Sequence, residues 1–160
     1  MEFINWAPLS TSLNNDDLAQ NSYEPPAVVM STAAKPVNVS APLQLEWPAD
    51  NVYDRYYIYL HFNEVEKLAK NETRSFNITV NGGFLFGPQI PVYQSVSTIS
   101  STTPTTGAKS HLISLFKTEH STHPPILNAI EVYKVKDFSL SETQQNDGKL
   151  ALYFLVSFVV

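Results

Sequence analysis

The sequence predicts an all-β sandwich of jelly-roll type, with short loops and little helix. Short segments alternate apolar and polar side chains, turn residues recur between them, and helical periodicity is nowhere sustained beyond about two turns. Eleven prolines against five glycines, together with nine phenylalanines and eight tyrosines, are typical of strands joined by rigid connections. A chain of 160 residues suits one domain that buries its own core.

The expected elements follow one another in a regular order. Residues 1–22 include a polar stretch, show no sustained period and are interpreted as a linker leading into the domain. Asn81-Gly82 is a strong hairpin dipeptide, and the polar segment 65–75 suits a turn or a short helical loop. Two prolines indicate an edge or bent strand within 83–100. Strands are expected at 27–35, 41–48, 55–66, 76–82, 83–100, 111–118 and 126–135.

Segment 55–66, RYYIYLHFNEVE, has an unusual composition on one of its two faces. Its even positions are apolar and should face a core, while Tyr57, Tyr59 and His61 should share the opposite face. These rings could meet a ligand, because a sugar stacks its C–H face on side chains spaced about 7 Å apart along a strand. They could equally fill the space between two sheets or lie under a loop, as tyrosines of sandwich cores often do.

Composition argues against several classes of function. A formal charge of −5 with no cluster of basic residues makes a nucleic-acid partner unexpected. The absence of cysteine removes disulfides, zinc–cysteine sites and thiol catalysis. Glu119, His120 and His123 lie in a loop that lacks the helical geometry of a zinc-binding HExxH motif. No metal, cofactor or enzymatic activity is therefore expected.

Two further groups of charged residues have a functional and a structural interpretation. Glu64 and Glu66 could be a glycosidase pair, but such carboxyl groups usually come from different strands, so a charged rim is favoured. Lys67, Lys70 and Arg74 could contact a peptide or an acidic pectin, but a solvated loop is the simpler interpretation.

Three N-glycosylation sequons begin at Asn38, Asn71 and Asn77. About two sequons are expected by chance in a chain of this composition, so their number alone proves little. Asn71 lies in a polar loop and is the best candidate, while Asn77 and Thr79 fall on the solvent side of an expected strand. Modification requires that the protein enter the secretory pathway.

Several strings taken together resemble the malectin-like ectodomain of plant leucine-rich-repeat receptor kinases, specifically its second half. The most specific is STHPPILNAIEVYKVKDFSLSET, in which a Pro-Pro pair precedes an alternating strand. The resemblance is colinear over about residues 5 to 147. The strings that carry it lie at residues 10–13, 23–47, 56–82, 87–88 and 121–143.

The resemblance implies a β-sandwich related to the animal lectin malectin and to galactose-binding-like folds. It also implies a non-catalytic extracellular recognition module of a plant receptor kinase, located at the outer face of the plasma membrane. A cell-wall oligosaccharide or a peptide would be its ligand, with a co-receptor as a further partner. The alternative is a structural spacer without its own ligand, derived from a truncated receptor gene.

The family pattern also sets expectations for the ends of the chain. A linker at residues 1–22, a malectin-like domain at 23–147 and an apolar tail at 148–160 are expected. The family's first malectin-like half, which would pack against this one, its signal peptide and its kinase domain are not recognised in the sequence. The tail is shorter than the run of about 20 apolar residues that spans a bilayer.

Overall fold

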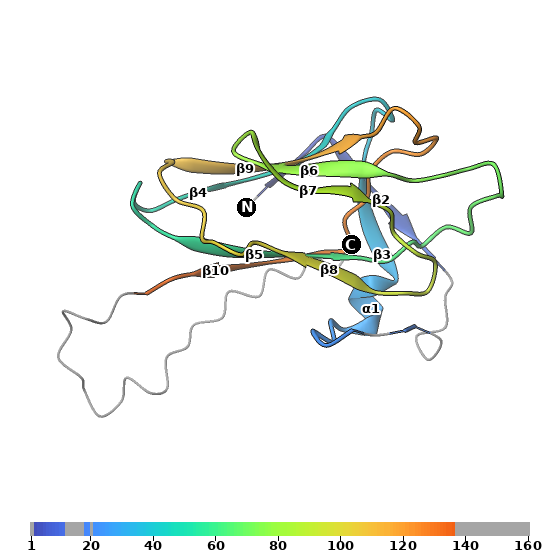
Figure 1. The fold of residues 1–160 in the computed structure, drawn as a ribbon, viewed down its shortest axis with the longest axis horizontal. Coiled ribbons are helices and arrows are strands. Elements are labelled where there is room, and N and C mark those ends of the chain that lie inside the picture. Colours follow the sequence, from blue (N-terminus) through green and yellow to red (C-terminus); the bar gives the residue numbers. More distant parts are fainter. Residues whose placement is uncertain (1, 12–17, 20, 137–160) are drawn as a thin grey trace.

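The computed structural model describes residues 2–11, 18–19 and 21–136, which form a sandwich of antiparallel sheets (Figure 1). This arrangement confirms the predicted all-β class. The elements are β1 (Glu2–Ile4), β2 (Trp6–Ser10), α1 (Ala27–Met30), β3 (Thr32–Pro36), β4 (Leu43–Pro48), β5 (Tyr56–Phe62), β6 (Phe76–Val80), β7 (Gly83–Gln89), β8 (Ser97–Ser100), β9 (Ser110–Lys117) and β10 (Ala129–Lys134).

The strands form one large sheet and two smaller ones. The five-stranded sheet has the order β1-β4-β9-β6-β7 and faces a three-stranded sheet of order β10-β5-β8 (Figure 1). Strands β2 and β3 pair with each other at one end of the sandwich. Backbone hydrogen bonds in both directions between Ala34 and Leu127, at 2.8 and 3.0 Å, attach β3 to the segment before β10.

Two expectations about the start of the chain differ from the structure. The interpretation of residues 1–22 as a linker did not anticipate β1 and β2, which are strands because β4 and β3 supply their pairing partners. The strand expected at 27–35 is divided into the single helical turn α1 and strand β3. Among the described residues, no helix is long and apolar enough to cross a membrane.

The hydrophobic core fills the space between the two sheets. Alternating positions of each strand point into it, as the period of two requires. Ile58 and Leu60 of β5 are 0% exposed, and Phe76 and Ile78 of β6 meet them from the opposite sheet. The core also contains Leu43, Leu45, Trp47, Tyr56, Phe62, Ile113, Leu115, Leu127 and Ile130.

The predicted hairpin between β6 and β7 is present. Asn81 and Gly82 both have positive φ values, 50° and 79°, as the two central residues of a type I′ turn require. Asn81 tolerates this conformation, and Gly82 adopts it without a steric penalty. Strand β7 lies at the edge of its sheet, as the prolines of this segment predict.

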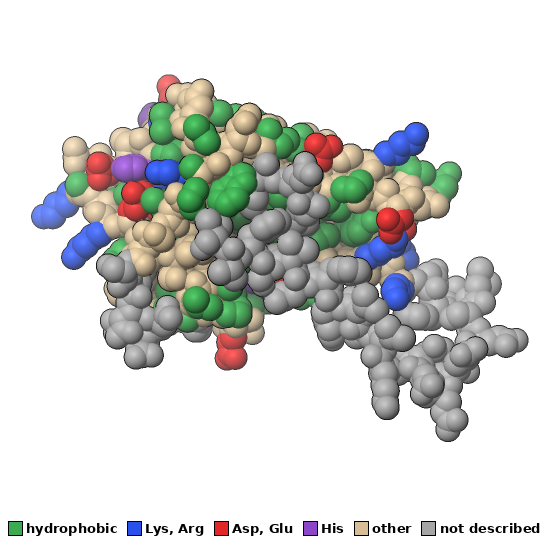
Figure 2. Space-filling model, turned by 180° about the vertical axis from the view of Figure 1, so that it is seen from behind, with side chains coloured by type: hydrophobic (Ala, Val, Ile, Leu, Met, Phe, Trp, Pro, Cys, Tyr) green, Lys and Arg blue, Asp and Glu red, His purple; other side chains and the backbone are tan. Residues whose placement is uncertain are grey.

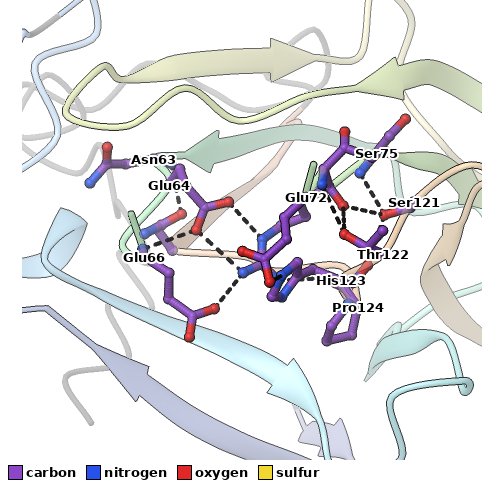
Figure 3. A network of polar contacts seen from close by, with 12 residues as sticks. Asn63, Glu64, Glu66, Glu72, Ser75, Ser121, Thr122, His123 and Pro124 are labelled. Carbon is purple, nitrogen blue, oxygen red and sulfur yellow. Dashed lines mark hydrogen bonds and ion pairs between the residues drawn. The ribbon is translucent and has the colours of Figure 1, made fainter. Parts of the chain in front are cut away.

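A buried arginine ties the loop after β5 to the loop before β10 (Figure 3). The Arg74 side chain is 0% exposed, and its Nε donates to Glu64 Oε2 at 2.7 Å. Its Nη2 donates to Glu66 Oε2 at 2.6 Å, and its Nη1 donates to the carbonyl oxygen of Pro124. The expectation that Arg74 belongs to a solvated basic loop is therefore wrong, because both glutamates face it.

Two buried asparagines join the same region to the N-terminal helix. The Asn63 backbone N–H donates to Asn128 Oδ1 at 2.8 Å, and Asn63 Nδ2 donates to the Met30 carbonyl at 2.9 Å. Asn128 Nδ2 donates to the Thr32 carbonyl at 2.8 Å. The two side chains thus satisfy the backbone carbonyl groups of Met30, at the C-terminal end of α1, and of Thr32, at the start of β3.

Replacing Arg74 by methionine should lower the free energy of unfolding by about 3–5 kcal/mol, because the Glu64 carboxylate would stay buried without its partner. Chemical denaturation of both proteins measures the difference. Lys67→Met, at an exposed position of the same loop, is the control and should change stability by about 0.5 kcal/mol or less. A loss of less than about 1 kcal/mol for Arg74→Met would contradict the structural role of the pair.

Candidate functional site

The outer face of the three-stranded sheet carries the predicted aromatic residues. Strand β5 directs Tyr57, Tyr59 and His61 away from the core, as the alternation predicts. Tyr57 and Tyr59 are half-buried, whereas His61 is 0% exposed. Direct contact with a ligand is therefore open to the two tyrosines and closed to the histidine.

Neighbouring tyrosines surround the ring of Tyr59. On β10, Tyr133 lies opposite Tyr57 in the ladder, and its ring meets the Tyr59 ring edge-on at a centroid distance of 5.5 Å. On the other side, the Tyr23 ring lies 5.6 Å from Tyr59. Edge-to-face and tilted pairs at these distances are favourable. The ring of Tyr59 is thus held in place before any ligand arrives.

A chain of polar contacts runs beneath these rings. Asn21 Nδ2 donates to Thr98 Oγ1 at 2.7 Å, and this hydroxyl lies 2.8 Å from His61 Nδ1. His61 Nε2 lies 3.5 Å from Glu131 Oε1, and the other oxygen of Glu131 accepts a hydrogen bond from the Tyr133 hydroxyl. This arrangement of donors and acceptors favours a neutral His61 ring, which accepts a hydrogen bond at Nδ1 and directs its Nε2–H toward Glu131.

The segment before α1 covers one end of this face. Ala19 N–H donates to the Gln94 carbonyl at 3.0 Å, and Val96 N–H donates to the Ala19 carbonyl at 2.9 Å. These bonds bring the segment alongside β8 and set the Tyr23 ring 6.2 Å from His61. The interpretation of rings lying under a loop is therefore correct for His61, while Tyr57 and Tyr59 stay partly accessible.

Two buried histidines have lowered pKa values. Burial is the main cause of the lowered pKa of His61, and the nearby Glu131 carboxylate opposes it. Burial likewise lowers the pKa of His111, which stacks on Trp47 at 5.2 Å and has its Nδ1 3.0 Å from Asn81 Nδ2. Both imidazoles are therefore stabilised in their neutral form.

The remaining sequence-predicted sites lie apart from this face. Asn71 and Asn38 are exposed, and the Asn38 side chain accepts the Ser40 N–H at 3.0 Å. Asn77 is half-buried in β6. His120 is exposed in its loop, and within the described ranges no three His, Cys, Asp or Glu side chains are grouped to hold a metal ion.

Sequence reasoning missed the residues that complete the face. Glu131 and Tyr133 lie in the strand expected at 126–135, but nothing local indicates that this strand pairs with β5. Tyr23 and Thr98 come from a polar segment and from an edge strand, where no pattern marks a contact with an aromatic ring. Pairing between distant strands decides which side chains meet, and this pairing is not a local property of the sequence.

Stability should fall as the pH is lowered from 7.5 to 5.5. A histidine whose pKa is lower in the folded state binds protons more readily in the unfolded chain, so protonation near its ordinary pKa of 6.5 favours unfolding. Each such group contributes at most about 1.4 kcal/mol per pH unit. Melting temperatures measured across this range test the effect. His61→Gln should flatten the slope, whereas His120→Gln at an exposed position should not, and an equal slope in all three proteins would contradict this assignment.

Comparison with known sequences gives a consistent set of relatives. The profile of the malectin-like domain family matches residues 1–135. A probable LRR receptor-like serine/threonine-protein kinase of Arabidopsis thaliana is 45% identical over 144 residues, which cover 89% of this chain and 16% of that protein. The probable LRR receptor-like serine/threonine-protein kinase PAM74 of the same plant is 43% identical over 145 residues, with the same coverage.

Solved structures share the fold at lower identity. The ANX2 ectodomain of Arabidopsis thaliana superimposes with a TM-score of 0.59 and 20% identity, over 82% of this chain and 40% of that one. A plant complex of the peptide RALF23 with FER and LLG2 gives a TM-score of 0.59 and 18% identity, over 81% of this chain and 39% of that one. The resemblance derived from the sequence is therefore confirmed, and the chain belongs to the malectin-like domain family of plant receptor-like kinase ectodomains.

Proposed function

We propose that this chain is an extracellular recognition module of a receptor-like kinase, which binds an oligosaccharide through the outer face of its three-stranded sheet. The observation that carries the proposal is the accessible pair Tyr57 and Tyr59, held on a rigid strand whose inner face is core. The module itself would be non-catalytic. The chain spans about 16% of the length of the curated relatives, so the kinase activity in their names would belong to other parts of those proteins.

The chemistry of this face suits a sugar. Half-buried tyrosine rings supply flat apolar surfaces for the C–H face of a pyranose, while their hydroxyl groups and the Glu131 carboxylate supply hydrogen bonds. Ser100 lies opposite Tyr59 on β8 and adds a further hydroxyl. His61 would support the face from below without touching the ligand, since Tyr23 and Thr98 enclose it.

Glu64 and Glu66 do not support a glycosidase function. Both carboxylates are ion-paired with Arg74, and Glu64 is 2% exposed. A retaining glycosidase needs two carboxyl groups about 5 Å apart on either side of an accessible sugar. We therefore infer binding without hydrolysis, and Glu64→Gln should have no catalytic phenotype.

A peptide ligand is the second candidate. One structural neighbour is a complex of the peptide RALF23 with FER and LLG2, although at 18% identity the likeness extends to the fold alone. By analogy with that complex, this chain would bind a peptide, and a co-receptor would be a further partner. A spacer role without any ligand is the third alternative, and the covering of His61 by Tyr23 is the observation in its favour.

Tyr57→Ala and Tyr59→Ala should each weaken oligosaccharide binding by about fivefold or more, because a lost stacking contact costs about 1 kcal/mol or more. Titration calorimetry with glucose-type and pectic oligosaccharides measures the affinity, and thermal unfolding measures stability in parallel. Tyr53→Ala, at a tyrosine that is 83% exposed on a loop, is the matched control and should change neither quantity.

Two outcomes would overturn this assignment. If the two substitutions lower stability by about 2–4 kcal/mol, the tyrosines act as core residues and the binding role of the face is lost. If the unaltered protein binds a peptide and none of the oligosaccharides, the peptide-binding role replaces the sugar-binding role. If it binds neither, the spacer role replaces it.

A further inference from the structure

The outer face of the five-stranded sheet, on the opposite side of the molecule, exposes an unusual amount of apolar surface. We define its outer patch as Phe84, Phe86, Ile90 and Phe116, which are 69%, 39%, 55% and 44% exposed. Three of the four are aromatic, and a concentrated apolar surface of this kind promotes association unless something covers it. Leu85, between the two phenylalanines on strand β7, packs against the core.

A glycosylation sequon lies in the middle of this patch. Of Asn77-Ile78-Thr79 on β6, the central Ile78 is 0% exposed in the core, so Asn77 and Thr79 point to the outer face. In the ladders, Asn77 lies directly opposite Phe116 of β9, and Thr79 lies directly opposite Phe84 of β7. The two sequon side chains are thus flanked by exposed rings on both neighbouring strands.

The Asn77 carboxamide is available for modification. Within the described part of the chain, its side-chain oxygen and nitrogen form no hydrogen bond, and neither atom is fully buried. Its oxygen lies beside Gly87, where a Cβ would stand only 2.2 Å from it. Glycine at this position of β7 therefore leaves room for the asparagine side chain at the surface of the sheet.

A pocket beside Asn77 could hold a sugar. It has a volume of about 430 Å³, and small-molecule sites begin at about 300 Å³. Pro88 and Ile90 give it an apolar wall, and Thr118 and His120 give it polar groups. An N-linked sugar has the same two kinds of surface, an apolar C–H face and a rim of hydroxyl and amide groups. The pocket can therefore receive a sugar that is attached at its own edge.

We propose that Asn77 carries an N-linked glycan whose first sugars occupy this pocket and shield the outer patch from solvent. The inference rests on the proposed extracellular location, because the acceptor sequence is modified only in the secretory pathway. It assigns different roles to the two outer faces of the sandwich. The face of the five-stranded sheet is covered by the protein's own glycan, and the face of the three-stranded sheet is left for recognition.

The other two sequons lack this combination. Asn71 is exposed in a turn whose neighbours are mostly charged or polar, so a glycan there would have no apolar surface to shield. Asn38 lies beside a pocket of about 340 Å³, but its side chain already closes a turn by accepting the Ser40 N–H. Asn71 is therefore a suitable reference site, at which a glycan should have little effect on surface hydrophobicity.

The test is to secrete the full chain from a glycosylating eukaryotic host and measure site occupancy by mass spectrometry, after release of glycans in ¹⁸O-labelled water. Asn77 should be occupied. Asn77→Gln and Thr79→Ala should each abolish that occupancy, raise the fluorescence of a hydrophobic dye severalfold and promote self-association in size-exclusion chromatography. Asn71→Gln is the matched control and should leave both readouts unchanged. Thr79→Ser keeps the sequon, so this variant should show the same occupancy, dye fluorescence and self-association as the unaltered protein.

Enzymatic removal of glycans from the folded protein tests the same point if a variant fails to fold. Dye binding should rise after the treatment of the unaltered protein and not after treatment of Asn77→Gln. An unoccupied Asn77 would overturn the inference, as would a glycan whose removal leaves dye binding unchanged. Oligosaccharide titration of the same samples tests the proposed function independently of the glycan, because the tyrosine face lies on the other sheet.

Discussion

Strand β5 has to satisfy two different environments with a single alternating sequence. Its even positions complete the core between the sheets, and its odd positions form a surface of rings on the outside. Because the period of a strand is two, a shift of one residue would exchange the two faces completely. The pairing of β5 with β10 and β8 on its two sides fixes the register, so both the core and the proposed recognition face depend on it.

Buried polar groups maintain the ends of this arrangement. Glu64 and Glu66 (Figure 3) form ion pairs with Arg74 that hold the loop after β5. The two asparagines Asn63 and Asn128 attach the α1 turn to the same corner. Loops carry backbone groups without ladder partners, and side chains must supply those partners when the loop is buried. On the face drawn in Figure 2, most of the charged side chains that can be seen lie toward the two ends of the molecule.

Local sequence patterns predicted those parts of the fold that depend on alternation and on turn chemistry. The strands around Leu45, Ile58 and Ile78, and the hairpin at Asn81-Gly82, follow directly from such patterns. Strands β1 and β2 form because distant strands pair with them, and the irregular segment 1–22 gave no local sign of this pairing. The polar segment around Arg74 likewise gave no sign that this side chain is buried. In the candidate site, the two tyrosines were recognised from one strand, whereas their neighbours Tyr23 and Tyr133 required the assembled sheet.

The most direct test is oxidative footprinting of the adjacent tyrosines of β5, with each site resolved by tandem mass spectrometry. If the strand has the register described, Tyr57 and Tyr59 will be modified while Tyr56, which is 6% exposed, stays protected. Oligosaccharide at saturating concentration will protect the first two and leave the exposed Tyr53 reactive. Modification of Tyr56 in the folded protein, or equal protection of all three strand tyrosines without ligand, would contradict the two-faced strand from which the proposed recognition follows.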